Sequence, residues 1–144
     1  MRRALLDVNV LVALLDEAHI HHALASSWLE RELQHGWASC PITQNGCVRI
    51  MSQPVYPGHF SAVQVAERLA EAANSPAHQF WPADVSLLEN SGINWSHVLG
   101  HRQVTDAYLL ALAIQHGGRF VTFDQRIVPQ AVIGATRNDL LILQ

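Results

Sequence analysis

Short apolar runs alternate along the chain with longer stretches in which apolar residues recur every three or four positions. The short runs predict buried strands, and the longer stretches predict helices. The predicted strands are residues 4–6, 37–40, 79–81, 120–123 and 140–143. The predicted helices are residues 8–15, 21–34, 43–52, 61–73, 85–90 and 105–116.

Capping residues set several of these boundaries. Pro41 suits the entry to the third helix, Ser61 the N-cap of the fourth, and Asp84 the N-cap of the short fifth helix. Gly36 and Gly117 stand where the second and last helices end. The last helix is apolar on nearly all sides, so other elements must cover it.

Strands that alternate with helices predict a parallel α/β sheet, here of four to five strands in one domain spanning residues 1–144. In such a sheet the carboxyl ends of strands and the N-termini of the following helices share one edge, where ligands bind. Asp7 and Asp124 end predicted strands, while Gln44 and Asp106 begin predicted helices. We therefore expect these four oxygen-bearing side chains to meet.

Three carboxylates about 4 Å apart repel one another by roughly 4 kcal/mol per pair at an effective dielectric constant of 20. A hard divalent cation with oxygen ligands, Mg²⁺ or Mn²⁺, relieves this repulsion and can activate water against a phosphodiester. Asn9, Thr105 and Thr122 are close enough in sequence to support the ligands. Singly, each aspartate also has a simpler explanation as a helix cap, a helix-dipole partner or a turn residue.

Composition narrows the function classes. The net charge is −3 and all nine basic residues are arginine, so the sequence has no global basic footprint and no lysine. Dehalogenase-like phosphatases and receiver domains use a lysine beside their aspartates and are therefore disfavoured. No Gly-x-Gly-x-x-Gly follows the first strand, which argues against dinucleotide binding. The sequence predicts neither an export signal nor a membrane span.

The histidines and cysteines suggest one further alternative. His19, His22, Cys40 and Cys47 include zinc-ligand types, but no Cys-x-x-Cys or His-Glu-x-x-His pattern is present. The histidines fit better as a surface or interface cluster, and the two cysteines as reduced, buried thiols of a cytosolic protein.

Four segments together resemble the motifs of the PIN domain, and more narrowly those of the VapC toxins of bacterial toxin–antitoxin pairs. They are residues 5–11, 43–49, 104–113 and 122–124. The resemblance implies a PIN-like α/β/α sandwich and a cytoplasmic, Mg²⁺-dependent endoribonuclease that cuts single-stranded RNA such as tRNA or rRNA loops. It also implies a homodimer, or a larger toxin–antitoxin assembly, neutralised by a VapB-type antitoxin.

By this resemblance Asp7, Asp106 and Asp124 are metal ligands, and Gln44 completes the catalytic set in place of the family's usual glutamate. Arg49, Arg102 and Arg126 flank the motifs, where they either contact the RNA backbone or remain solvated. Because an amide replaces an acid at position 44, a catalytically weakened RNA-binding or protein-interaction module stays an alternative. A PIN-like nuclease acting on DNA flaps is disfavoured because the chain is short.

Overall fold

The computed structural model describes residues 2–144 and places five parallel strands in one sheet, in the order β3-β2-β1-β4-β5. The strands are β1 (Ala4–Leu6), β2 (Trp37–Ser39), β3 (His78–Phe80), β4 (Arg119–Thr122) and β5 (Leu140–Ile142). β1 is central, with Leu5 paired to Ala38 of β2 on one side and Phe120 of β4 on the other. The predicted parallel sheet is confirmed.

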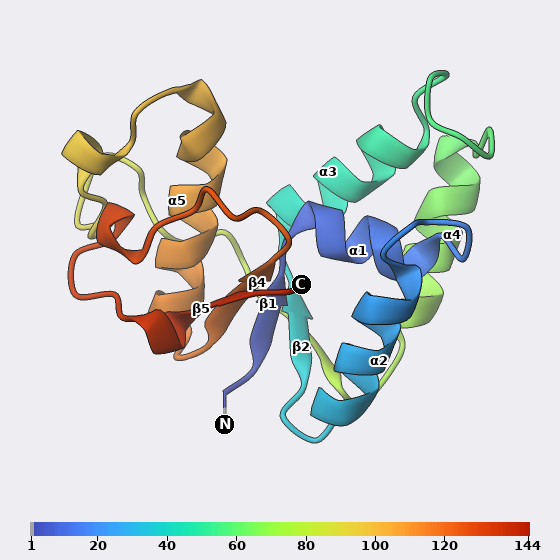
Figure 1. The fold of residues 1–144 in the computed structure, drawn as a ribbon, viewed down its shortest axis with the longest axis horizontal. Coiled ribbons are helices and arrows are strands. Elements are labelled where there is room, and N and C mark those ends of the chain that lie inside the picture. Colours follow the sequence, from blue (N-terminus) through green and yellow to red (C-terminus); the bar gives the residue numbers. More distant parts are fainter. Residues whose placement is uncertain (1) are drawn as a thin grey trace.

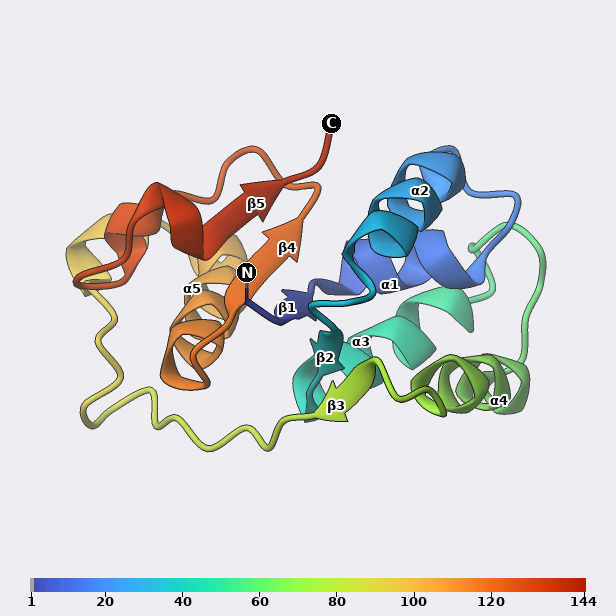
Figure 2. The same ribbon diagram turned by 90° about the horizontal axis from the view of Figure 1, so that it is seen from below.

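Helices cover both faces of this sheet, as Figure 1 and the turned view in Figure 2 show. One face carries α1 (Val8–Leu15), α2 (His22–Glu32), α3 (Pro41–Met51) and α4 (Ala62–Ala73), and the other carries α5 (His101–Gln115). Short 3-10 helices lie at Trp95–His97, Pro129–Ala131 and Arg137–Asp139. The predicted α/β/α sandwich is therefore confirmed, and the cap predicted at Ser61 forms a capping box with Gln64.

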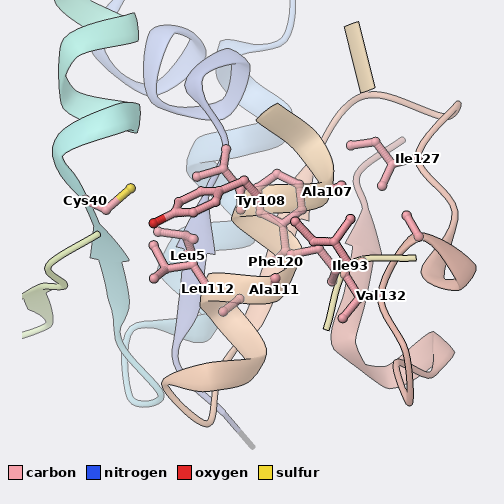
Figure 3. Close-up of a cluster of buried hydrophobic side chains, with 14 of the residues drawn as sticks. Leu5, Cys40, Ile93, Ala107, Tyr108, Ala111, Leu112, Phe120, Ile127 and Val132 are labelled. Carbon is pink, nitrogen blue, oxygen red and sulfur yellow. The ribbon is translucent and has the colours of Figure 1, made fainter. Parts of the chain in front are cut away.

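The core on the α5 side joins one helix to the centre of the sheet. Figure 3 shows Tyr108, Ala111 and Leu112 of α5 beside Leu5 and Phe120. The segments around Ile93 and Val132 also pack against α5, since both residues belong to the same buried cluster as its apolar side chains (Figure 3). Backbone hydrogen bonds join residues 92–94 to residues 131–133. This cover satisfies the expectation that a helix apolar on most sides must be buried.

The core on the opposite face is built by four helices, and α1 and α3 approach closely within it. A Cβ added to Gly46 of α3 would lie 2.6 Å from a Cγ of Val8 at the start of α1. Only a residue without a side chain allows this approach. The contact holds α3 against the segment that carries Asp7.

Two element predictions are wrong. Residues 85–90 form no helix, and Asp84 accepts a hydrogen bond from the ring of His116 at 2.9 Å instead of capping one. α5 begins at His101 rather than near residue 105, so Asp106 lies in the second turn of the helix and not at its start. The extra turn carries α5 past the edge of the sheet at which β1 and β4 end.

The structure bears on the expectations about the two cysteines and about membrane-spanning helices. Cys40 and Cys47 are both free and buried, as predicted. Between residues 2 and 144, none of the helices combines the length and apolar character needed to cross a bilayer.

Candidate active site

The three predicted aspartates line one pocket at the carboxyl edge of the sheet. Asp7 follows β1, Asp124 follows β4, and Asp106 projects from the second turn of α5. The carboxylates are near enough to influence one another, since Asp7 and Asp124 both raise the pKa of Asp106. The predicted convergence of these three residues is therefore a feature of the fold.

Asp7 is the most buried of the three, with only 7% of its surface exposed. Its Oδ1 accepts a hydrogen bond from the backbone N–H of Val8 at 2.7 Å, and its Oδ2 accepts one from the Thr122 hydroxyl at 2.6 Å. Burial raises the pKa of Asp7 and nearby Asp124 adds to the rise, while the two hydrogen bonds oppose it. Asp7 is thus the fixed member of the cluster and also the N-cap of α1.

The pKa values of Asp106 and Asp124 are shifted in opposite directions. Burial raises the pKa of Asp106 to about 7, with further contributions from Asp7 and Asp124 and a smaller opposing one from Arg126. The pKa of Asp124 is lowered, chiefly by hydrogen bonds from the Arg126 side chain. Near pH 7 about half of the metal-free molecules therefore carry a proton on Asp106, while Asp124 is ionised and paired with Arg126.

One hydroxyl connects both strand ends. The Thr122 oxygen donates to Asp7 and accepts from the Asn9 amide at 3.3 Å and from the backbone N–H of Asp124 at 3.0 Å. A hydroxyl has one donor and two acceptor positions, so Thr122 is fully engaged. Asn9 in turn accepts from the N–H of Phe123. The supporting roles predicted for Asn9 and Thr122 agree with these contacts, whereas Thr105 is exposed and makes none of them.

The structure does not bring Gln44 into this pocket. The Gln44 side chain donates a hydrogen bond to the Ser39 hydroxyl at 3.0 Å and lines a groove between α3 and α4, together with Leu69 and Ala73. It helps to attach the start of α3 to β2. The face of α3 that turns toward the aspartates carries instead Gly46, against Val8, and Ile50, in the pocket wall.

The remaining wall of the acidic pocket holds residues that the sequence patterns did not single out for this role. Ile50 and Tyr56 line it, as does His19, which the sequence suggested only as part of a histidine cluster. Of the three flanking arginines, Arg102 and Arg126 line the pocket, and Arg49 is an exposed residue of α3 outside it. Contacts of this kind depend on how helices and loops pack in three dimensions, which leaves no short motif in a sequence.

An apolar cavity of about 100 Å³ adjoins the acidic pocket. Its wall includes Leu99, Ile127 and Val128, and it shares Asp106 and Arg126 with the pocket. Arg126 therefore stands at the boundary between a charged region and an apolar one.

The donor set fits a hard divalent cation. Three carboxylates that disfavour one another's ionisation, in a pocket open to solvent, are the ligands that Mg²⁺ or Mn²⁺ prefers. Within residues 2–144, no three Asp, Glu, His or Cys side chains lie close enough together to coordinate a metal ion in this arrangement. In this arrangement the Asp7 carboxylate accepts a hydrogen bond from Thr122, and the Asp124 carboxylate accepts one from Arg126.

Comparison with known proteins defines the class. Residues 4–131 match the family model of the PIN domain. The chain belongs to the PIN domain family.

Relatives from Mycobacterium tuberculosis narrow this assignment. The chain is 52% identical to Ribonuclease VapC44 over 141 residues, which cover 98% of this chain and 99% of the relative. It is 44% identical to Ribonuclease VapC39, over 91% of this chain and 95% of that protein. The predictions of a VapC-type PIN protein and of a ribonuclease are confirmed.

A solved structure agrees in fold. The crystal structure of Mycobacterium tuberculosis VapC20, a toxin that cleaves the sarcin–ricin loop, aligns with a TM-score of 0.56. The alignment covers 81% of this chain and 85% of VapC20 at 16% sequence identity. At that identity the comparison supports the architecture and not the choice of RNA.

Proposed function

We propose that this protein is a Mg²⁺-dependent endoribonuclease toxin that hydrolyses phosphodiester bonds in single-stranded RNA such as tRNA or rRNA loops. The single observation that carries the proposal is the joint position of Asp7, Asp106 and Asp124 around one solvent-open pocket. Mn²⁺ has the same ligand preference and can take the place of Mg²⁺. The proposal treats residues 1–144 as one PIN domain.

In this proposal the three aspartates hold the cation, which when bound supplies Lewis-acid activation of water and neutralises charge on the phosphate. Thr122 keeps the Asp7 carboxylate oriented because its hydroxyl donates to Oδ2, and the Asn9 amide in turn donates to that hydroxyl. Asp106 must lose its proton before it can serve as a ligand. Arg102 and Arg126, at the pocket wall, are placed to contact phosphates of the RNA.

The biological setting is part of the same proposal. VapC-type proteins are the toxin halves of toxin–antitoxin pairs, so we infer that a VapB-type antitoxin neutralises this protein in the cytoplasm. We further infer a homodimer that assembles into a larger complex with the antitoxin. Size-exclusion chromatography with light scattering, on the protein alone and co-expressed with any small reading frame found beside its gene, tests both inferences.

Cleavage of a randomised pool of single-stranded RNA, read by sequencing of the product ends, tests the activity. We expect cuts in Mg²⁺ or Mn²⁺ that EDTA abolishes and that excess Mg²⁺ restores. Products should carry 5′-phosphate and 3′-hydroxyl ends. RNA that binds without being cut in either metal would favour the alternative of a catalytically weakened binding module.

A further inference from the structure

Arg126 donates three hydrogen bonds to the Asp124 carboxylate. Its Nε donates to Oδ1 at 3.0 Å, its Nη2 donates to Oδ2 at 3.1 Å, and its backbone N–H donates to Oδ1 at 2.9 Å. Both oxygens of a proposed metal ligand are thus held by a residue two positions further along the chain.

These hydrogen bonds oppose metal binding at the same carboxylate. A carboxylate offers about four lone-pair positions, and Arg126 uses three of them at Asp124. A cation approaching those oxygens meets a guanidinium of the same charge sign. Cation and guanidinium therefore compete, and the side-chain bonds must open before Asp124 can become a ligand.

Arg126 is exposed, and its guanidinium is a group that binds phosphate as well as carboxylate. Its side chain is 65% exposed, on the turn that follows β4. It lines both the acidic pocket and the adjoining apolar cavity, so the space beside Asp124 can accommodate its guanidinium. A guanidinium donates in a planar fork that matches the oxygens of a phosphate as well as those of a carboxylate.

We propose that Arg126 is a positioning residue that holds Asp124 while the cation is absent and transfers to a phosphate of the RNA when the cation binds. The inference rests on the proposed function. It gives one side chain two successive partners, so metal binding would prepare the pocket for RNA.

Metal affinity without RNA tests the first half. Mn²⁺ binding is measured by electron paramagnetic resonance on the wild type and on Arg126→Ala, Arg126→Lys and Arg102→Gln. Lysine keeps the charge but cannot form the two parallel side-chain bonds, so we expect both Arg126 variants to bind Mn²⁺ about two- to fivefold more tightly. Arg102 lines the same pocket and makes no hydrogen bond to the three aspartates within the described residues, so its variant controls for charge alone.

The opposite pattern would overturn the inference. If charge alone mattered, Arg126→Lys would match the wild type and Arg102→Gln would bind Mn²⁺ as tightly as Arg126→Ala. The readouts also separate the two proposals. A wild type that takes up no Mn²⁺ contradicts the proposed function, whereas uptake that Arg126→Lys does not strengthen contradicts only the role of Arg126.

Salt dependence of RNA binding tests the second half. Anisotropy of a short fluorescent single-stranded RNA is followed against salt concentration, with Ca²⁺ replacing Mg²⁺ to slow cleavage. Loss of one phosphate contact lowers the slope of log K against log salt by about 0.7 for a single strand. We expect this loss in Arg126→Ala and not in Arg126→Lys. An unchanged slope in Arg126→Ala would rule out the transfer to phosphate.

Discussion

Two neighbouring strands of the sheet, β1 and β4, have arginines at their amino ends and aspartates just beyond their carboxyl ends. At the amino edge, Arg2 and Arg3 precede β1 and Arg119 begins β4. At the carboxyl edge, Asp7 follows β1 and Asp124 follows β4. The same two strands thus place positive charges at one end and negative charges at the other. The two sets of charges differ in how fully the rest of the molecule supplies them with partners.

Each arginine of the amino edge donates to at least one oxygen of the protein, although the buried Nε of Arg119 has no partner within the described residues. Arg2 donates to Asp139 at 2.6 Å and to the carbonyl of Gly118 at 3.1 Å. Arg3 donates to the carbonyl of Ala77 at 2.7 Å, and Arg119 donates to Glu32 at 3.0 Å. These charges join neighbouring strands and helices.

The aspartates of the carboxyl edge are matched only in part. Asp7 has hydrogen bonds and Asp124 has Arg126, yet the pKa of Asp106 rises to about 7 because burial and its acidic neighbours oppose its ionisation. A charge that serves only the fold would be expected to find a partner within the fold. Under the proposed function the acidic edge binds a cation, whereas the contacts of the basic edge stabilise the fold.

Replacing Asp106 by Asn should have the largest effect and sharpen this contrast. We expect RNA cleavage to fall on the order of a thousandfold, while the midpoint of thermal unfolding at pH 8 rises because the repulsion is removed. Asp139→Asn makes the same chemical change at the amino edge and is the matched control. It should lose about 1 kcal/mol of stability and keep its cleavage rate. Stability is measured by calorimetry and activity by RNA cleavage. If Asp106→Asn and Asp139→Asn changed both quantities equally, the proposed difference between the two edges would be wrong.

Thr122→Val tests the hydroxyl that joins the two strand ends. Valine has a similar shape but leaves Asp7, Asn9 and the N–H of Asp124 without their shared partner. We expect Mn²⁺ affinity to fall about ten- to hundredfold, as for other groups that orient a ligand. Thr122→Ser keeps the hydroxyl and should retain most of the affinity. A valine variant that binds Mn²⁺ normally would show that the network does not orient Asp7.

Metal affinity should also depend on pH through Asp106. Its pKa is about 7 in the folded protein against 3.8 ordinarily, so the folded state binds more protons between these values. Stability of the metal-free protein should therefore fall as pH rises from about 4 to 7 and level off above that. Mg²⁺ must displace the proton, so its affinity should rise by about tenfold per pH unit below 7. Titration calorimetry across this range would show a flat profile if Asp106 were not a ligand.

Gln44→Glu should have the smallest effect. The side chain faces α4 and bonds to Ser39, away from the aspartates, so an added carboxylate there is remote from the cation. We expect Mn²⁺ affinity and cleavage to stay within about twofold of the wild type. A marked gain in either quantity, checked in the same assays, would instead restore position 44 to the catalytic set.

Much of this architecture was predictable because periodicity and strand-end chemistry are local. The runs ending at Asp7 and Asp124 are buried on both faces, and the parallel connection of their strands places both carboxylates at one edge. Asp106 was predicted at the same edge for a partly mistaken reason. It reaches the pocket from the second turn of a helix that begins earlier than its apolar pattern suggested.

The errors arise where tertiary contacts decide. Gln44 is near the correct edge, but the rotation of α3 about its axis is set by the contact between Gly46 and Val8, which no local pattern reports. Residues 85–90 have helix-compatible composition, yet Leu88 is 91% exposed and Asp84 bonds to His116. These residues lack a buried apolar face that would stabilise a helix.

The hydrogen bond between Thr122 and Asp7 spans 115 positions of the chain. A polypeptide still being translated can fold α1 and α2 early, but it lacks two of the three proposed ligands until α5 and β4 have emerged. Under the proposed function, a nascent chain of this kind could not cleave RNA for most of its own synthesis. Premature termination upstream of Asp106 would likewise leave a fragment without a cutting site.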